Sequence, residues 1–340
     1  MIVMLGFKIK HNRDFSDELN KAKQVAQYAI EHRTLSSKNV KQFGLKSVIA
    51  NQILRKYSRN FRAKKVKSVK LTVPAQGIKF DHRNRTITIT SLGLELGYYF
   101  RNDFEKISQI ELDRDFAYVS VLIPEKAMIE PVGYLGIDRN ATSHIAVVGN
   151  PKTGKVLKLG KQAEHVHKKY KSIRRNLQKR GKYRKVKKTK RRESRIEKDI
   201  NNKVSKKIVQ EAKQNGMGIK LEYLKGIRKA KSGRNFRYSL NSWSFYQLEQ
   251  MIEYKARLLG IPVVYVDPYN TSKDCSRCRQ IGNRSGKSFE CSQCGHVDHA
   301  DANASFNIAL RPVFEEGTDR LHADRDACKG NTDIPKEATL

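Results

Sequence analysis

The chain is short of acidic residues and of long apolar runs. It has 34 aspartates and glutamates against 69 lysines and arginines, which gives a formal net charge of +35 over 340 residues. So large an excess of one sign favours a polyanionic partner, nucleic acid first, over a merely solubilising surface. No run of about 18 apolar residues is available to cross a bilayer, and the apolar opening 1–6 is too short for a secretory signal. We therefore expect a cytoplasmic protein of the prokaryotic cytosol or nucleoid, with no membrane partner.

Cysteine is scarce too, and four of the five cysteines are clustered. Cys275 and Cys278 form one C-x-x-C pair, and Cys291 and Cys294 form a second pair after 12 intervening residues. In a reducing compartment this spacing favours a metal site over disulfides, which would be strained in loops this short. Four thiolates fill the tetrahedral coordination sphere of zinc and leave no place for a reacting water, so we predict one structural Zn²⁺. Cys328 lies apart in a polar tail and is assigned no role.

Positive charge is concentrated in one segment. Residues 168–198 contain 17 lysines and arginines and only two acids, Glu193 and Glu197, so they supply 17 − 2 = +15 of the net charge. Blocks of like charge are often solvated or disordered. Here interspersed apolar residues favour a helical hairpin along a phosphate backbone, at about 163–212. The predicted nucleic-acid-binding residues are Lys168, Lys169, Arg174, Arg175, Lys179, Arg180, Arg184, Lys187, Lys188, Arg191 and Arg192.

The first third of the chain mixes two periodicities. Apolar residues recur at helical spacing in 17–33 and 40–57, whereas beyond residue 65 they alternate with polar residues in several short segments. We expect residues 1–131 to form a small, wedge-like β-barrel domain, with a helical recognition lobe at about 14–62.

From residue 132 the pattern is that of an α/β domain. Three strands of a meander precede the basic hairpin, and a strand, a helix and a further strand follow it, at 134–137, 145–148, 156–159, 219–223, 244–259 and 261–266. We divide this half into a nuclease-like domain at 132–270, a zinc-ribbon insert at 271–297 and a final helix within 298–312. Residues 313–340 are polar and without period, as in a disordered tail.

Three carboxylates occupy prominent places in these elements. Asp138 ends the first strand, Glu222 lies on an otherwise apolar strand, and Asp301 opens the final helix. A buried, unpaired carboxylate is costly, so each residue taken alone predicts a structural partner. Taken together, their order matches the ribonuclease-H-like arrangement that hydrolyses phosphodiesters with two Mg²⁺ ions, for which Mn²⁺ is a substitute. The fold class expected is α/β plus β-barrel, with a ribonuclease-H-like (RuvC) mixed sheet carrying the zinc ribbon.

At this point the sequence resembles the TnpB family of insertion-sequence proteins, once called OrfB transposases and related to type V CRISPR effectors. Residues 136–139 (Gly-Ile-Asp-Arg) are similar to the first RuvC motif, 221–224 to the second and 299–304 to the third. Residues 271–275 are similar to the start of the zinc-bearing insert. The resemblance covers about 134–310 and rests on the order of the motifs as well as their content.

The resemblance implies an RNA-guided DNA endonuclease of a transposable element. Its partners would be a guide RNA from the transposon end and a double-stranded DNA target, with a short adjacent motif read by the N-terminal part. Asp138, Glu222 and Asp301 would be the catalytic, magnesium-binding residues. Asn140 and Arg279 replace glycines that are common in the family, and Asn202 lies near the usual place of a histidine. None of these departures removes a carboxylate or a thiolate, and the sequence carries no signal of oligomeric state.

Three other functions compete with this one. A nuclease-dead, RNA-guided repressor would be expected to have lost some carboxylates or thiolates, and this chain keeps all seven. A DNA strand-transferase would use the same metals with a 3′-hydroxyl nucleophile instead of water. In a non-catalytic zinc-ribbon RNA-binding protein the three acids would be structural. We expect the nearby His296 and His299 to contact solvent or nucleic acid and not to replace a thiolate.

Overall fold

The computed structural model describes residues 3–124, 126–141, 143–224 and 245–314. The chain divides into two compact units, Met1–Glu125 and Lys126–Leu340. Almost all of the predicted tail, 315–340, lies outside the described residues. None of the described helices is long and apolar enough to span a bilayer.

The first unit joins a pair of helices to antiparallel sheets. A four-stranded sheet has the order β1-β7-β6-β2, and a three-stranded sheet has the order β3-β4-β5. Strand β7 alternates buried and partly buried side chains, as expected for a sheet with one face on a core. The strands are β1 (Val3–Lys10), β2 (Leu71–Pro74), β3 (Ile78–Asp81), β4 (Thr86–Ile89), β5 (Leu94–Gly97), β6 (Lys106–Leu112) and β7 (Phe116–Ile123). Closure of these strands into a barrel stays a prediction.

The helices of the first unit lie within the predicted recognition lobe. Helix α1 (Ser16–His32) packs against α2 (Ser47–Ser58), and a 3₁₀ helix, η1 (Ser37–Phe43), lies between them in sequence. Val25, Ala29 and Ile53 are among the side chains buried where the helices meet. Small residues on α1 allow this close approach. Short 3₁₀ turns, η2 (Ala75–Gly77) and η3 (Thr90–Leu92), flank the three-stranded sheet.

A mixed five-stranded sheet organises the second unit, in the order β10-β9-β8-β11-β12. Strands β8 to β10 form an antiparallel meander, whereas β11 runs parallel to both β8 and β12. Strand β11, which lies between β8 and β12, is buried along its whole length, which is typical of parallel strands covered on both faces. The strands are β8 (Tyr134–Arg139), β9 (Ala146–Gly149), β10 (Val156–Leu159), β11 (Gly218–Glu222) and β12 (Val263–Val266).

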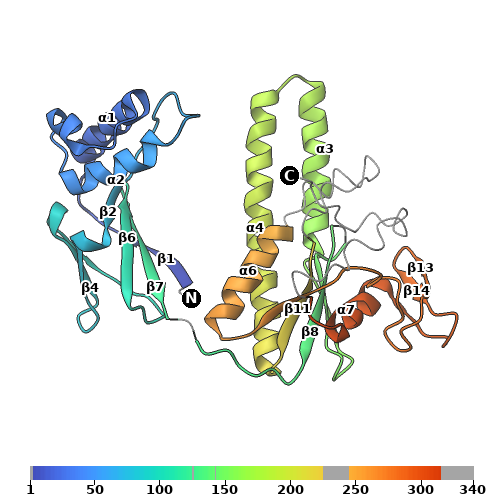
Figure 1. Cartoon of the computed structure of the whole chain (residues 1–340). Coiled ribbons are helices and arrows are strands. Elements are labelled where there is room, and N and C mark those ends of the chain that lie inside the picture. Colours follow the sequence, from blue (N-terminus) through green and yellow to red (C-terminus); the bar gives the residue numbers. More distant parts are fainter. Residues whose placement is uncertain (1–2, 125, 142, 225–244, 315–340) are drawn as a thin grey trace. The chain divides into compact units, whose positions relative to one another are not determined.

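Three helices of the second unit follow from apolar spacing. Helices α3 (Gln162–Lys179) and α4 (Tyr183–Gln214) form a long hairpin, seen as the paired yellow-green helices in Figure 1. The second half of α4 packs on α6 (Phe245–Leu258) and on the sheet, with Ile200, Val204 and Ile208 buried at intervals of four residues. The first half has no comparable run of buried apolar residues.

Helix α7 (Ala300–Leu310) docks closely on β8 and β9, as Figure 1 shows for β8. Two strand glycines make this possible. A Cβ added at Gly136 would lie 1.9 Å from the carbonyl oxygen of Ser305, and one added at Gly149 would lie 2.5 Å from Ser305 Oγ. Real side chains do not tolerate such contacts, so the helix can reach the sheet only over glycine. This docking carries the first turn of α7 toward the end of β8.

A small sheet, β13-β14-β15, connects β12 to α7. Its strands are β13 (Asn283–Ser285), β14 (Ser288–Glu290) and β15 (Val297–His299), and they pair antiparallel. Phe289 is fully buried beside Cys275 and Cys291. An apolar core this small needs a further cross-link for stability. A metal ion bound by the four cysteines would be such a cross-link.

Candidate functional site

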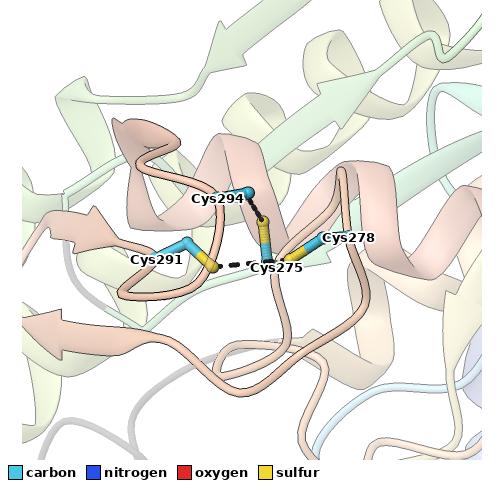
Figure 2. Close-up of side chains that lie close together, drawn as sticks. All are labelled: Cys275, Cys278, Cys291 and Cys294. Atoms are coloured by element: carbon cyan, nitrogen blue, oxygen red, sulfur yellow. Dashed lines mark hydrogen bonds between the residues drawn. The ribbon is translucent and has the colours of Figure 1, made fainter.

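The four clustered cysteines converge as predicted (Figure 2). Their sulfurs all lie within 4.8 Å of one another. Cys275 Sγ is 3.6 Å from Cys294 Sγ, and Cys278 Sγ is 3.5 Å from Cys291 Sγ. A tetrahedron with Zn–S bonds of about 2.3 Å has S–S edges of about 3.8 Å, whereas a disulfide needs about 2.05 Å. The cluster therefore fits a structural zinc ion.

Both halves of the zinc site use the same backbone turn. The amide of Arg279 donates to the carbonyl of Cys275, and that of Gly295 donates to the carbonyl of Cys291, each at 3.0 Å. Arg279 has φ 66° and Gly295 has φ 65°, so both are in the left-handed region. Backbone N–H groups of Cys294 and Gln293 also lower the pKa of the Cys291 thiol to about 7. A lowered pKa favours the thiolate, which is the form that binds metal.

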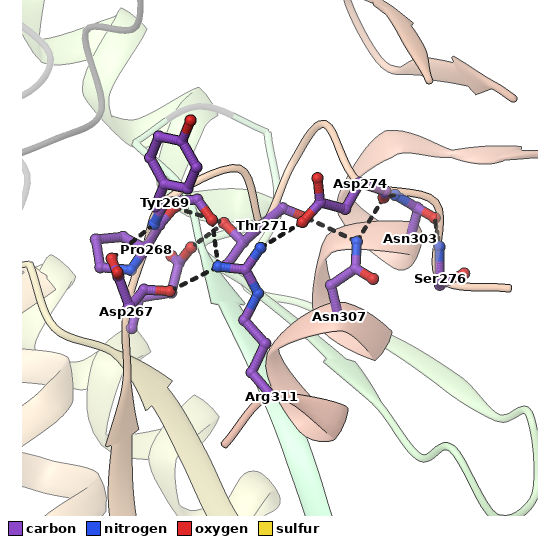
Figure 3. A network of polar contacts seen from close by, with 10 residues as sticks. Asp267, Pro268, Tyr269, Thr271, Asp274, Ser276, Asn303, Asn307 and Arg311 are labelled. Carbon is purple, nitrogen blue, oxygen red and sulfur yellow. Dashed lines mark hydrogen bonds and ion pairs between the residues drawn. The ribbon is translucent and has the colours of Figure 1, made fainter. Parts of the chain in front are cut away.

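Buried polar side chains attach the zinc-ribbon insert to helix α7 (Figure 3). Asn303 donates to the carbonyl of Asp274 at 2.7 Å and accepts from the amide of Ser276 at 2.8 Å. Asn307 donates to the same Asp274 carbonyl at 2.6 Å, and Arg311 pairs with the Asp274 carboxylate at 2.5 Å. These hydrogen bonds and this ion pair fix the position of the loop that begins the cysteine cluster.

The three predicted carboxylates come together from three elements. Asp138 lies on β8, Glu222 ends β11 and Asp301 lies in the first turn of α7. Asp301 is fully buried and Glu222 is 7% exposed. Burial first, then the charges of Glu222 and Asp301, raises the pKa of Asp138 to about 8. A carboxylate so strongly disfavoured in its charged form is typical of a functional site that a cation completes.

Two polar residues position the first two carboxylates. The side-chain amide of Asn140 donates to Asp138 Oδ2 at 2.8 Å. The hydroxyl of Thr271 donates to Glu222 Oε1 at 2.5 Å. The sequence reasoning did not assign either residue a role in the site. For Asn140 the sequence held one signal. It follows β8 directly, two residues after Asp138, and residues two apart in extended backbone point to the same side.

Asp301 receives two cations from the zinc-ribbon sheet. Lys287 Nζ lies 2.6 Å from Asp301 Oδ2, and Arg284 Nη2 lies 3.4 Å from Asp301 Oδ1. The ring of His299 accepts from the backbone N–H of Asp301 at 3.3 Å and so caps the helix. Sequence reasoning missed both cations, because they reach Asp301 only through the pairing of β14 with β15. The zinc ribbon thus contributes charge to the carboxylate site as well as shape.

The predicted nucleic-acid-binding residues lie on the α3–α4 hairpin. Arg174 differs from the others in exposure, because its side chain is only partly exposed and its guanidinium pairs with Glu193. The other ten are exposed on the two helices and their connection: Lys168, Lys169, Arg175, Lys179, Arg180, Arg184, Lys187, Lys188, Arg191 and Arg192. Their contact with nucleic acid stays a prediction.

Comparisons with known proteins relate this chain to two groups. A family model described as Cas12f1-like, TNB domain, matches residues 245–308. The CRISPR-associated endodeoxyribonuclease Cas12f1 of Sulfoacidibacillus thermotolerans is 43% identical over 114 residues, which is 32% of this chain and 26% of that protein. The match therefore spans about a quarter of Cas12f1. A Cas12f1 structure, solved with sgRNA and target DNA, has a TM-score of 0.60 at 16% identity, covering 88% of this chain and 82% of that one, and shows a shared fold.

Proteins named TnpB-like match over more of their length. One from Aquifex aeolicus is 29% identical over 167 residues, covering 42% of this chain and 54% of that protein. Another, from Methanocaldococcus jannaschii, is 32% identical over 225 residues, covering 62% of this chain and 79% of that protein. With this similarity and the four clustered cysteines, this chain belongs to the TnpB family.

Proposed function

We propose that the protein is an RNA-guided DNA endonuclease of a transposable element, with Asp138, Glu222 and Asp301 as its catalytic residues. The observation that carries the proposal is that acids from β8, β11 and α7 lie close enough to interact: burial first, and then the charges of Glu222 and Asp301, raises the pKa of Asp138 to about 8. The names of the relatives, endodeoxyribonuclease among them, support this reaction over a purely structural role. The order of strands and acids supports the finer assignment to the ribonuclease-H-like, RuvC class.

The carboxylates suit magnesium. Three acids share one partly buried site in which the pKa of Asp138 is raised, and Mg²⁺ prefers hard oxygen ligands such as carboxylates. Asp138, Glu222 and Asp301 would hold two Mg²⁺ ions, which supply an activated water and stabilise the charge that develops on the leaving oxygen. The thiolates are too soft for Mg²⁺ and stay with zinc.

The chain's own residues prepare the site for a phosphodiester. Asn140 donates to one oxygen of Asp138 and Thr271 donates to one oxygen of Glu222, and these hydrogen bonds orient the two carboxylates. Lys287 and Arg284 place positive charge beside Asp301, where the phosphate backbone of a bound strand would gain from it.

The basic hairpin supplies the long-range part of nucleic-acid binding. Its exposed lysines and arginines project from two long helices and carry no sequence information of their own. We assign them to the phosphates of the guide RNA or of the DNA paired with it. Affinity carried by such contacts should fall steeply as salt concentration rises.

Replacing Asp138 by alanine tests the proposal. RNA that co-purifies with the wild-type protein is sequenced, and DNA matching it is offered with Mg²⁺. We expect the variant to retain the RNA and to cut at least about a thousandfold more slowly, since a ligand of the reacting metals is lost. The matched control is Asp199→Ala, because Asp199 is exposed on α4 and, within the described residues, pairs with its helical neighbour Lys203 alone.

The products and the metal separate the competing functions. Hydrolysis leaves free ends, whereas strand transfer leaves joined strands. Chelation of divalent metal ions should stop DNA cutting. Adding either Mg²⁺ or Mn²⁺ should restore it. Wild-type cutting by Asp138→Ala would overturn the assignment of this residue, and intact DNA in every condition would support a non-catalytic protein.

A further inference from the structure

A second set of metal-type side chains lies between helices α3 and α4, apart from the carboxylates and the cysteines. His167 on α3 faces Glu193 and Glu197 on α4, and one ligand atom from each lies within 4.8 Å of the others. The two glutamates are four residues apart and therefore share one face of α4. Nothing in the proposed nuclease function uses these three residues.

The two oxygens of Glu193 face different partners. Arg174 pairs chiefly with Oε2, while His167 Nδ1 lies 3.3 Å from Oε1. Burial raises the pKa of Glu193, but the hydrogen bonds from His167 and Arg174 outweigh it and hold that pKa below its ordinary value. Glu193 is thus ionised and buried, with one oxygen directed into the cluster.

Glu197 lacks this compensation. In the described part of the chain its carboxylate makes no hydrogen bond and no ion pair. Burial, and then the charge of Glu193, raises its pKa to about 7. Arg174 pairs with one of two neighbouring carboxylates, whereas in the described residues the second makes no ion pair, and the charges of His167 and Arg174 lower its pKa less than burial and Glu193 raise it. A partly buried pair of acids with one arginine therefore has room for additional positive charge.

The donor set selects the kind of cation. One imidazole and two carboxylates suit Zn²⁺ and related divalent transition metals, whereas Mg²⁺ and Ca²⁺ prefer oxygen ligands alone. Three protein ligands are the number found in sites that keep a position for water. We propose that His167, Glu193 and Glu197 bind one divalent transition-metal ion, Zn²⁺ in particular, which clamps α3 to α4 within the basic hairpin.

A metal bound between His167 and the two glutamates would hold α3 against α4. The first half of α4 carries a dense positive charge, and like charges on two adjacent helices repel. The buried apolar residues that hold α4 to the sheet, such as Ile200 and Val204, come only after the cluster. A metal joining His167 to Glu193 and Glu197 would hold the helices together at the edge of this apolar core, which includes Val166 and Ile196.

Zinc titration of the full-length protein tests the site. Protein that retains the zinc of its four cysteines is stripped of RNA and of loosely bound metal, and Zn²⁺ uptake is followed by calorimetry and by elemental analysis. We expect the wild-type chain to take up one more ion than Glu197→Gln. His167→Ala should bind that ion at least about tenfold more weakly, because one of three ligands is gone.

Two controls isolate the cluster. Glu164→Gln removes an acid on α3 that pairs with Lys168 and should leave zinc uptake unchanged. Asp138→Asn alters the candidate catalytic site, and it should also leave the extra ion bound. Glu197→Gln removes only a charge that burial disfavours, so it decides the question if His167→Ala fails to fold. Equal uptake by the wild type, His167→Ala and Glu197→Gln, or no uptake by the wild type, would overturn the proposal.

Discussion

The two carboxylate clusters of the second unit differ in how they are assembled. Asp138, Glu222 and Asp301 come from three elements that are far apart in sequence, and α7 must dock on the sheet before they meet. Glu193 and Glu197 share one helix, and His167 comes from the adjacent helix of the same hairpin. The first cluster depends on the tertiary fold and the second on local pairing, so each should respond to different changes.

The largest effect is expected from Gly136→Ala, a change that should disrupt the first cluster and leave the second intact. In Gly136→Ala the new methyl group would collide with the backbone of Ser305 and Ala309, and α7 would have to move away from β8. We expect a loss of about 3 kcal/mol in the free energy of unfolding, measured by urea denaturation, because overpacking at backbone has no simple relief. DNA cutting should fall as Asp301 is displaced.

The control for this change is Gly97→Ala. Gly97 is also a strand glycine, but nothing lies within 4 Å of the position its Cβ would take. Gly97→Ala should therefore change the free energy of unfolding little. Extra zinc uptake by the hairpin should persist in Gly136→Ala, and an unfolding free energy within about 0.5 kcal/mol of wild type would contradict the docking argument.

The second prediction uses pH to sharpen the contrast. The pKa of Asp138 is about 8 in the folded chain against an ordinary 3.8, so the folded state keeps a proton that the unfolded state loses. The free energy of unfolding should fall as pH rises from about 4 to about 8. Asp138→Asn escapes this fall, and in metal-free buffer it should be about 2 kcal/mol more stable than wild type at pH 8.

The same pair of proteins supplies the internal control at low pH. Near pH 4 the wild-type carboxyl is protonated when folded, and the two proteins should then unfold at similar urea concentrations. A stability difference that does not change with pH would mean that the proton on Asp138 is not its cause.

The smallest effect belongs to the hairpin, and there the two acids should respond with opposite signs. The pKa of Glu197 is raised to about 7, so its charge destabilises the folded state as pH rises from about 4.5 through 7. In metal-free buffer at pH 8, the free energy of unfolding of Glu197→Gln should exceed that of wild type by about 1 kcal/mol, after allowance for screening by water. Glu193 has a lowered pKa, and Glu193→Gln should destabilise at that pH.

Thermal unfolding of both variants, with and without Zn²⁺, checks the pair. Added zinc should raise the melting temperature of wild type more than that of either variant, since only the wild type keeps all three ligands. If Glu193→Gln and Glu197→Gln shifted stability in the same direction, the ion pair with Arg174 would not be what distinguishes these acids.

Much of the site could be predicted from residue pattern, because some signals are local. The spacing of Cys275, Cys278, Cys291 and Cys294 predicts their convergence, which the structure confirms. Apolar runs around Asp138 and Glu222 predict strands, which the structure confirms, and the resemblance to TnpB proteins implies a catalytic role for three acids that stays a prediction. These inferences needed the order of elements along the chain and not their detailed packing.

The missed features all depend on contacts between elements. Lys287 reaches Asp301 through a small sheet whose pairing the sequence does not display. Arg174 was grouped with nucleic-acid-binding residues, but the register of two helices places it against Glu193. Gly136 was noted only as part of a motif, and its steric role appears once α7 lies on β8. Composition and periodicity carry no information about such registers.

The position of Asp301 in the last described helix has a consequence for protein synthesis. A ribosome makes Asp138 and the whole basic hairpin well before it reaches Asp301, so a nascent chain can carry its basic hairpin while its third carboxylate does not yet exist. Domains generally begin to fold from the N-terminal side during translation. A guide RNA would then be able to meet the growing chain before that chain could cut, which favours loading first and activity afterwards.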